Sequence, residues 1–530
     1  GRAALELQVR MSRAGVRAEF HVVVFPGASV VRHWVSFENT TELPVRLKLD
    51  EHFAFRLPDE SFTQYWMFGG TGRENSGLMQ QASVRPSYHR ALLGYMTDFY
   101  APWMALQRSG GRDGWFISPE YHIRWILSVD RGPSGGPTVS ATMPDLADHE
   151  LSAGERITLP TVTLGVFDHS LDDMARRIYD WQYEYLWDFT REEWHARIPI
   201  LANWYNDVHN LQENFAGRLA DLDLTTADVM RTTGAEMLWH DAGWSESPNI
   251  WAPTRNGPDF AQTNRHLAKS GMNLVVWFAG VPSEGMMDAK VGSWGDFQWR
   301  TDGYIAREAW SAQGMIKQVE RFLLKHPRSS FHTCAGGGRF AHTFDWQRYA
   351  SLNFLTDSGG GPQTNYYFSY FETPDKWTDI VPIMSGTYRS ATARQVLTAV
   401  PCWHLTFDPE RKADDFEQAR RMFEIYRFLR SEGVAGRWSY VAHPAVKGDE
   451  EYFYFQRLSR DRKRSCVILK HRAPGPVTIY PRELLPEWNY VVGFDSSRQT
   501  HVRTGRDLME NGIEIVDQVP GEIIYLGLPD

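Results

Sequence analysis

The sequence is poor in cysteine, and it has neither a long basic run nor a long apolar one. Its three cysteines among 530 residues, Cys334, Cys402 and Cys466, are too scattered for a disulfide framework or a cysteine-based metal site. A net charge of −9 without a basic run argues against nucleic acid and anionic membranes as partners. No stretch approaches the roughly 20 apolar residues of a membrane span. The chain is long enough for several globular domains.

Sequence motifs of several cofactor and nucleophile classes are also missing. The segment CAGGGR at 334–339 lacks the Lys-Ser/Thr of a phosphate loop and does not match the dinucleotide pattern, and no G-x-S-x-G occurs. The histidines, His209, His332, His342 and His404 among them, show no ligand spacing. We therefore expect neither a metal nor an organic cofactor. The few cysteines and the lack of a visible signal peptide favour the cytoplasm. The sequence starts at Gly1 without an initiator methionine, so trimming of the N-terminus stays open.

Aromatic residues are abundant. They make up 14% of the chain and include 21 tryptophans. A large core would use such rings, and so would a sugar-binding site, because a flat ring buries a wide face and keeps a polar edge.

Hydrophobic periodicity divides the chain into four parts. Residues 1–169 alternate apolar and polar positions between turn residues, as in HVVVF and VVRHWVSFEN, which predicts an antiparallel β-supersandwich. Residues 170–198 predict a linking helix with Ser170 as its N-cap. Residues 199–437 alternate short apolar runs with helical stretches, which favours a (β/α)8 TIM barrel. Residues 438–530 return to alternation and predict a small C-terminal antiparallel β-domain, a β-sandwich.

The segment WRTDG places two charged residues on one face of a predicted barrel strand. Because alternate strand residues share a face, Arg300 and Asp302 point together, with Arg300 beneath the carboxylate. A guanidinium near Asp302 would favour its ionised form, which a glycosidase nucleophile requires. The alternatives are a structural Arg–Asp pair or an aspartate that opens a turn.

Two further aspartates end apolar runs in the same way. Asp357 in LNFLTDSGGG has apolar residues behind it and an open glycine loop ahead, surroundings that raise a carboxyl pKa as a general acid needs; an aspartate in a glycine turn is the alternative. Asp241 in LWHDAGW lies near Trp244, so a carboxylate and an indole could bind a sugar together. His240 faces the opposite side of that strand, which argues against a shared metal.

Taken in order along the chain, these segments resemble the glycoside hydrolase family 36 α-galactosidases and α-N-acetylgalactosaminidases. The most specific part is HTCAGGGRF followed by LNFLTDSGG, which is similar to the family's Cys-[Ser/Ala]-Gly-Gly-Gly-Arg segment and the Ser-Asp or Thr-Asp that follows it. The segments DAGW and VVRHWVSFENTTELPVRL add to the resemblance, which covers nearly the whole chain.

The resemblance implies roles for named residues. Asp302 takes the place of the catalytic nucleophile and Asp357 that of the acid/base. The substrate-binding positions that it implies are Asp241, Trp244, Trp204, Trp277, Arg300, Cys334, Gly336, Gly337 and Arg339. Bare glycine backbone after Cys334 would let amides approach the hydroxyls of the sugar ring.

The chain departs from the family pattern around the hydroxyl-reading part of the pocket. Arg300 stands where the family has Lys, His332 where it has an acidic or amide residue, and the Glu-Pro-Glu after Trp277 is missing. The segment 281–296 barely provides the dozen or more residues of a crossover, which leaves open whether a loop is missing from the sequence there.

These observations lead to an expected function. The resemblance implies a retaining exo-α-glycosidase that releases terminal α-galactosyl residues from oligosaccharides or glycoconjugates. Its expected partner is the glycan substrate, and a homo-oligomer is expected because members of the family often form them. An α-N-acetylgalactosaminidase or another galacto-type glycosidase is the alternative within the class. Transglycosylation and a non-catalytic carbohydrate-binding protein on a hydrolase scaffold stay open as further alternatives.

Overall fold

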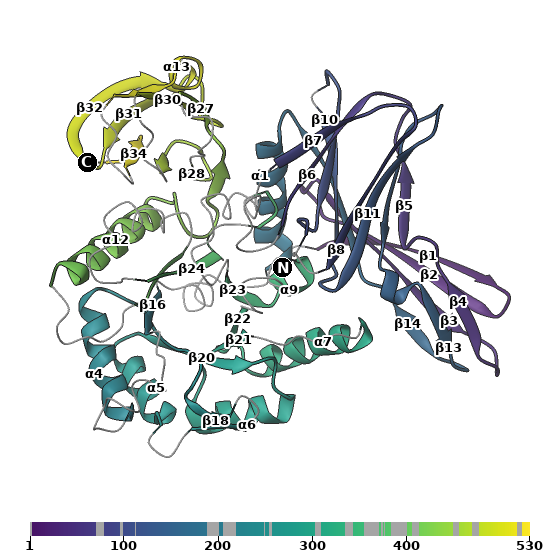
Figure 1. Cartoon of the computed structure of the whole chain (residues 1–530), viewed down its shortest axis with the longest axis horizontal. Helices are drawn as coiled ribbons and strands as arrows, with labels where there is room; N and C mark the ends of the chain where they lie inside the picture. Colours follow the sequence, from purple (N-terminus) through teal and green to yellow (C-terminus); the bar gives the residue numbers. More distant parts are fainter. Residues whose placement is uncertain are drawn as a thin grey trace.

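The computed structural model describes the chain in eighteen stretches. They are residues 3–69, 79–95, 99–111, 113–187, 201–204, 219–247, 250–253, 257–302, 309–333, 343–354, 370–372, 375, 377–382, 400–404, 413–448, 455–468, 476–516 and 522–529. Figure 1 shows a β-rich N-terminal part, a central barrel and a small C-terminal β-domain. No helix in these stretches has the length and apolar character needed to cross a membrane.

Antiparallel sheets form the N-terminal part, as the alternating pattern predicted. The large, nine-stranded sheet has the order β1 (Leu5–Arg13), β2 (Val16–Val24), β3 (Val30–Asn39), β15 (Val162–Asp168), β10 (Asp113–Pro119), β9 (Met104–Arg108), β6 (Phe62–Met67) and β7 (Met79–Val84), with β14 (Arg156–Thr158) paired to β3. A four-stranded sheet has the order β5 (Phe53–Arg56), β12 (Thr138–Thr142), β11 (Arg124–Arg131) and β8 (Tyr88–Tyr95). A third sheet pairs β13 (Asp148–Leu151) with β4 (Val45–Lys48), next to the 3-10 turn Pro144–Leu146.

The alternation of side chains explains how these sheets pack. In β11, Trp125, Leu127 and Val129 are buried while the residues between them are more exposed. They join one core with residues of the large sheet such as Val35 and Leu106, so the two sheets bury their apolar faces against each other. Gly94 of β8 pairs with Trp125, and a Cβ atom on this glycine would lie 2.0 Å from the indole.

Helix α1 (Leu171–Trp181) links the sandwich to the rest of the chain and continues as a π-helical turn, Gln182–Leu186. The side chain of Ser170 caps it by accepting a hydrogen bond from the backbone of Asp173, as the sequence predicted. Met174, Ile178 and Trp181 are buried in a core shared with Phe25 of the sandwich and with the C-terminal domain. The helix therefore packs against both the N-terminal sandwich and the C-terminal domain.

The central part is built on eight parallel strands that close into a barrel. In order these are β16 (Leu201–Trp204), β17 (Met237–His240), β20 (Asn273–Ala279), β21 (Gln298–Asp302), β22 (Ser330–Thr333), β23 (Ala350–Phe354), β24 (Trp377–Pro382) and β25 (Val400–His404). The described helices between or after them are α4 (Leu219–Thr232), α5 (Phe260–Lys269), α6 (Glu284–Trp294), α7 (Ala309–Lys325), α9 (Phe344–Gln347) and α12 (Ala413–Ser431). A hairpin of β18 (Ser245–Ser247) and β19 (Ile250–Pro253) follows β17.

The segment 281–296 is long enough for its crossover. It holds helix α6, and the strands on either side of it, β20 and β21, pair in parallel. The residues present therefore provide the crossover, because an eleven-residue helix with short connections spans the distance between the two strands.

The C-terminal part has two antiparallel sheets. The larger has the order β26 (Tyr440–Ala442), β28 (Phe455–Leu458), β29 (Ser465–Ile468), β34 (Ile523–Leu526), β31 (Asn489–Phe494) and β32 (Ser497–Thr504). The smaller has the order β27 (Ala445–Lys447), β30 (Val477–Tyr480) and β33 (Ile513–Ile515), and helix α13 (Gly505–Asn511) lies between β32 and β33 in the chain. The four domain boundaries given above stay predictions.

Candidate functional site

Strand β21 carries the two charged residues that the sequence analysis placed on one face. Trp299 faces away from the barrel interior, since its ring packs on Phe297 and, beyond it, on residues of α7 and β22. Arg300 points the other way, toward Trp239 and Asp241 of β17 and the loop after it. Asp302 ends the strand, so by alternation its carboxylate shares the face of Arg300.

The carboxylate of Asp302 is held by a neighbouring tryptophan. Trp277 of β20 is level with Arg300 in the parallel register, and its indole nitrogen donates a hydrogen bond to Asp302 Oδ2 over 3.0 Å. The backbone oxygen of Asp302 accepts a hydrogen bond from Gly280 at 2.5 Å. Both contacts fix the position of the last residue of β21, which is the place where barrel enzymes carry their reactive groups.

Arg300 lies buried beneath this carboxylate. Its side chain is only 2% exposed, and its Nε lies 3.8 Å from Asp241 Oδ2. The guanidinium carbon lies 3.9 Å from the centre of the Trp239 ring, a cation–π distance. A planar guanidinium suits a stacked site better than a lysine ammonium does.

Asp241 follows the last residue of β17 and faces Arg300. Burial raises the pKa of its carboxyl, while Arg300 and the backbone N–H of Ala242, at 2.7 Å, act in the opposite direction. The charge of Asp302 raises it further, so the two carboxylates share one neighbourhood. His240 turns to the other side of the strand and packs edge-on against Phe260, as alternation predicted.

His332 of β22 completes the layer that contains Arg300. It pairs with Arg300 in register, is fully buried, and its Nε2 lies 3.5 Å from a guanidinium nitrogen of Arg300. Burial and the adjacent Arg300 charge hold the pKa of His332 well below its usual value. The ring is therefore neutral at physiological pH, and its Nε2 can accept from the guanidinium.

Trp244 does not fit the sugar-binding role that the resemblance implied. Its side chain is fully buried, and Phe260, Phe278 and Trp294 surround the ring edge-on. Its indole N–H donates to the backbone oxygen of Trp277 over 2.7 Å. The prediction that Trp244 binds sugar is therefore corrected. The Trp244 ring faces the helices that cover the barrel, and its indole N–H holds the backbone of Trp277.

A chain of buried polar groups joins the ends of β22 and β23. The hydroxyl of Thr333 donates to Asn353 Oδ1 over 2.7 Å, and the amide nitrogen of Asn353 donates to a carboxylate oxygen of Glu372. Asn353 and Glu372 are both fully buried. These contacts fix the described ends of β22 and β23, and Thr333 directly precedes Cys334 in the sequence.

Several predicted site residues lie outside the described part of the chain. They are Asp357, Cys334, Gly336, Gly337 and Arg339. Trp204 is described in its backbone, which pairs with His240 at the end of β16. The structure thus brings together Asp241, Trp277, Arg300 and Asp302.

The sequence analysis missed Trp239 and the pairing of His332 with Arg300 in this neighbourhood, and Asn353 and Glu372 at the ends of β22 and β23. Trp239 could have been found, because it lies two positions before Asp241 and so shares its face. Glu372 carried no signal, since it lies 19 residues after Asn353 and only the fold brings the two side chains together. Among the described residues, no three His, Cys, Asp or Glu side chains are arranged to hold a metal.

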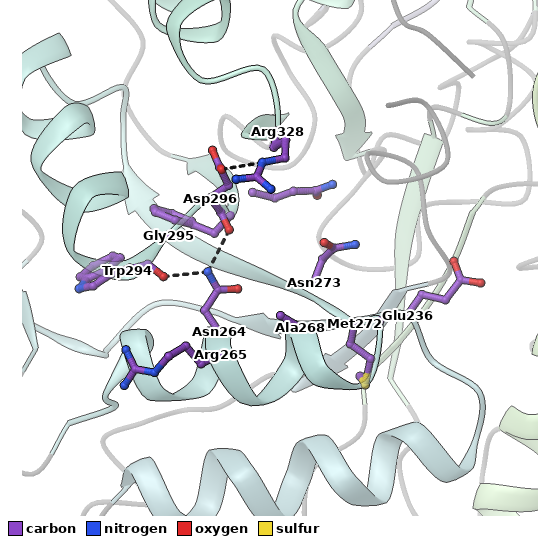
Figure 2. A pocket seen from close by; sticks show the side chains of 13 residues that line it. Glu236, Asn264, Arg265, Ala268, Met272, Asn273, Trp294, Gly295, Asp296 and Arg328 are labelled. Carbon is purple, nitrogen blue, oxygen red and sulfur yellow. Dashed lines mark hydrogen bonds and ion pairs between the residues drawn. The ribbon is translucent and has the colours of Figure 1, made fainter. Parts of the chain in front are cut away.

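A separate pocket of about 530 Å³ lies at the opposite end of the same strands. It is lined by residues at the start of β20 and β21, such as Asn273 and Gln298, and by α5. Figure 2 shows Asn264 reaching across it to the backbone of Trp294 and Asp296, while Asp296 pairs with Arg328 at 3.2 Å. These contacts fasten α5 to the start of β21. This end of a barrel serves stability rather than chemistry.

Comparisons with known proteins place the fold. No family model matches the sequence, and no curated protein matches it either. Solved structures do match: an α-galactosidase from Lactobacillus brevis has a TM-score of 0.81 at 14% identity, with 99% of this chain and 82% of that chain covered. The family 36 α-galactosidase AgaA from Geobacillus stearothermophilus has a TM-score of 0.81 at 14% identity, with coverage of 99% and 83%. AgaB from the same organism has a TM-score of 0.79 at 15% identity, with coverage of 99% and 82%.

The resemblance stated from the sequence is thereby confirmed at the level of fold. Nearly the whole chain adopts the architecture of the glycoside hydrolase family 36 α-galactosidases, although few residues are identical.

Proposed function

We propose that this protein is a retaining exo-α-glycosidase that removes terminal α-galactosyl residues from oligosaccharides or glycoconjugates. The observation that carries the proposal is Asp302, a carboxylate at the C-terminal end of a barrel strand with its Oδ2 held by the indole of Trp277. The shared fold supports the proposal, because the AgaA variants among the similar structures were solved in complex with stachyose and raffinose.

The barrel itself is part of this proposal. We infer that the eight parallel strands and the helices between them form a complete (β/α)8 barrel, in which loops after the strands build the active site. Asp241 follows β17 and Asp302 ends β21, the two strands on either side of β20, in agreement with this arrangement.

In the proposed mechanism Asp302 attacks the anomeric carbon while Asp357 protonates the leaving oxygen. The C–O bond to the leaving group breaks, and a glycosyl ester on Asp302 forms. Asp357, now a base, takes a proton from water, and the oxygen of that water displaces Asp302 from the sugar. Two displacements retain the configuration, which requires carboxyl groups roughly 5–5.5 Å apart.

The remaining polar groups suit the recognition of sugar hydroxyls. Asp241 in its ionised form accepts hydrogen bonds, and Arg300 holds it in place from below at 3.8 Å. Because Arg300 is buried and already stacked on Trp239, we assign it to orienting Asp241 rather than to direct contact with the sugar. The changed residues Arg300 and His332 leave N-acetylgalactosamine open as a second galacto-configured substrate.

A panel of aryl α-glycosides tests the proposal. The galactoside, the N-acetylgalactosaminide, the arabinopyranoside and the glucoside should differ strongly in kcat/KM, with the galactoside highest. Proton NMR of the first product should show the α-anomer before mutarotation. Asp302→Ala should abolish turnover and leave galactose binding intact. If Asp302 were only a structural residue, its loss would not separate turnover from binding in this way.

Three outcomes would change the conclusion. Binding of galactosides by the unmodified protein without hydrolysis, even of activated aryl substrates, would favour a carbohydrate-binding protein. A β-anomer as first product would overturn the retaining mechanism. Transfer products that dominate at high acceptor concentration would favour a transglycosidase.

A further inference from the structure

The pocket at the N-terminal ends of β20 and β21 (the base pocket) is large enough for a small ligand. Its volume of about 530 Å³ lies within the roughly 300–1,000 Å³ of small-molecule sites. Three side-chain amides line it: Asn264 of α5, Asn273 at the start of β20 and Gln298 at the start of β21. Gln298 is only 3% exposed, at a level where a barrel usually places branched apolar side chains. Packing alone therefore does not account for this polar lining.

The carboxylates that line the base pocket are already paired with cations. Glu236 lies 3.4 Å from Arg430, and Asp296 lies 3.2 Å from Arg328. Figure 2 shows that Arg265, the remaining charged residue of the lining, extends away from both carboxylates. A charged ligand between the two carboxylates would give up hydration without gaining an unpaired counter-charge. The charges of the lining therefore favour a neutral ligand.

The base pocket offers hydrogen-bond acceptors beside donors. Helices α5 and α6 both end at it, and the carbonyl groups of their last turns give it a partial negative charge. The amide nitrogen of Asn264 donates to the backbone oxygens of Trp294 and Asp296 over 2.8 and 2.9 Å, which leaves Oδ1 as a further acceptor. The amides of Asn273 and Gln298 can each donate and accept. A hydroxyl group also does both, so a small ligand with several hydroxyl groups matches this lining.

The base pocket and the proposed active site lie at opposite ends of the same strands. Gln298 shares the strand face of Arg300 and Asp302, and Asn273 shares that of Trp277. At about 3.3 Å per residue, Gln298 and Asp302 are separated along β21 by roughly 13 Å. A molecule in the base pocket is therefore out of reach of the Asp302 carboxylate. Because arginines engage both carboxylates of the lining, the pocket suits binding rather than catalysis.

We propose that the base pocket is a second, non-catalytic binding site for a small neutral molecule with several hydroxyl groups, such as a free monosaccharide. The helix ends and Asn264 accept hydrogen bonds from its hydroxyl groups, and the amides of Asn273 and Gln298 donate to them. The proposal goes beyond the proposed function and does not depend on it, because the lining alone selects the class of ligand. Free galactose and myo-inositol are suitable probes, since both are uncharged and rich in hydroxyl groups.

Hydrogen exchange measured by mass spectrometry on the full chain tests the proposal. Residues 264–273 cover the α5 side of the base pocket, and residues 239–242 cover Trp239 and Asp241 at the other end of the barrel. Galactose and myo-inositol at high millimolar concentration should each slow exchange in 264–273, because a bound ligand suppresses local opening. Protection of 264–273 by galactose without protection of 239–242 would support the base pocket and count against the proposed active site, so the two proposals are tested separately.

Ala268 allows the base pocket to be filled from an exposed position of α5. Ala268→Phe and Ala268→Met should both lose the ligand-dependent protection of 264–273 and keep the melting temperature of the unmodified protein. Lys269→Phe is the matched control: this residue is the next one on the helix, is also exposed and lies outside the lining, so protection should persist. The comparison also separates binding from the general stabilisation that sugars exert by exclusion from protein surfaces, because exclusion acts on every variant alike.

Three results would overturn the proposal. Exchange in 264–273 that neither galactose nor myo-inositol slows would do so. Protection that Ala268→Phe and Ala268→Met both retain in full would place the ligand elsewhere. Protection by inorganic phosphate or by the diamine putrescine, but not by the two neutral probes, would show that the base pocket selects a charged ligand.

Discussion

The indole nitrogen of Trp277 donates a hydrogen bond to Oδ2 of Asp302 across two neighbouring barrel strands, over 3.0 Å. The backbone oxygen of Trp277 in turn accepts from the buried indole of Trp244 at 2.7 Å. One tryptophan thus orients the carboxylate, and a second tryptophan holds the first. The proposed nucleophile is fixed by aromatic residues that were expected to touch the sugar.

Trp277→Phe keeps an aromatic ring at this position but removes the indole N–H that donates to Asp302, so kcat should fall. Loss of a hydrogen bond to a charged group, about 1.5–3 kcal/mol, corresponds to roughly a 10- to 150-fold decrease. Steady-state kinetics with an aryl α-galactoside measures the change in kcat. Trp488→Phe, at an exposed position of the C-terminal domain, is the control. An unchanged kcat with a raised KM would show that Trp277 only contacts sugar.

Replacement of Arg300 should act through Asp241. Arg300→Met leaves a buried carboxylate without the cation that lowers its pKa, so the pKa of Asp241 should rise further above its ordinary value. If Asp241 must be ionised to accept sugar hydroxyls, the acidic limb of the kcat/KM profile should move to higher pH. Arg300→Lys should restore part of the activity and move the limb back. A profile that does not move in Arg300→Met would contradict this role.

Glu372→Gln tests the buried chain from Thr333 through Asn353. The carbonyl oxygen of a glutamine can still accept from the amide of Asn353, but a neutral hydrogen bond then replaces a charge-assisted one, so the ends of β22 and β23 should be held less firmly. We expect a drop in turnover of about tenfold, since a charge-assisted hydrogen bond is about twice as strong as a neutral one. The loss should be larger for raffinose than for a dinitrophenyl galactoside, because only a poor leaving group needs the acid. Equal losses for both substrates would point to general unfolding.

Acid should destabilise the N-terminal sandwich through His52. Burial lowers the pKa of His52 to about 4, and its Nδ1 accepts the backbone N–H of Met143 at 3.1 Å. Between pH 6.5 and pH 4, His52 is protonated in the unfolded chain and neutral in the folded protein. The free energy of unfolding therefore falls as the pH drops from 6.5 toward 4. The loss from this group is about 1.5 kcal/mol between pH 6.5 and pH 5.

His52→Asn should flatten that dependence, because its side-chain oxygen can still accept from Met143 and does not titrate. Urea unfolding at both pH values compares the two proteins. The same slope in His52→Asn as in the unmodified protein would assign the acid sensitivity to other groups.

The alternation of side chains was enough to predict much of this structure. It identified the antiparallel sheets, the helix capped by Ser170, and the common face of Arg300 and Asp302, because strand period and capping are local properties. It also separated His240 from Asp241. The residues of β24 and β25 were not singled out in advance, although the pattern predicted a barrel of eight strands.

What the sequence determined by itself is therefore most of the strands, their inward faces and the carboxylates at their ends. The partners of those side chains were decided by the tertiary structure. Closure of the barrel sets Trp277 against Asp302 and stacks Arg300 on Trp239, and it turns Trp244 into the outer core. The reason is physical: periodicity within a strand says which way a side chain points, whereas the register between strands distant in sequence says what it meets.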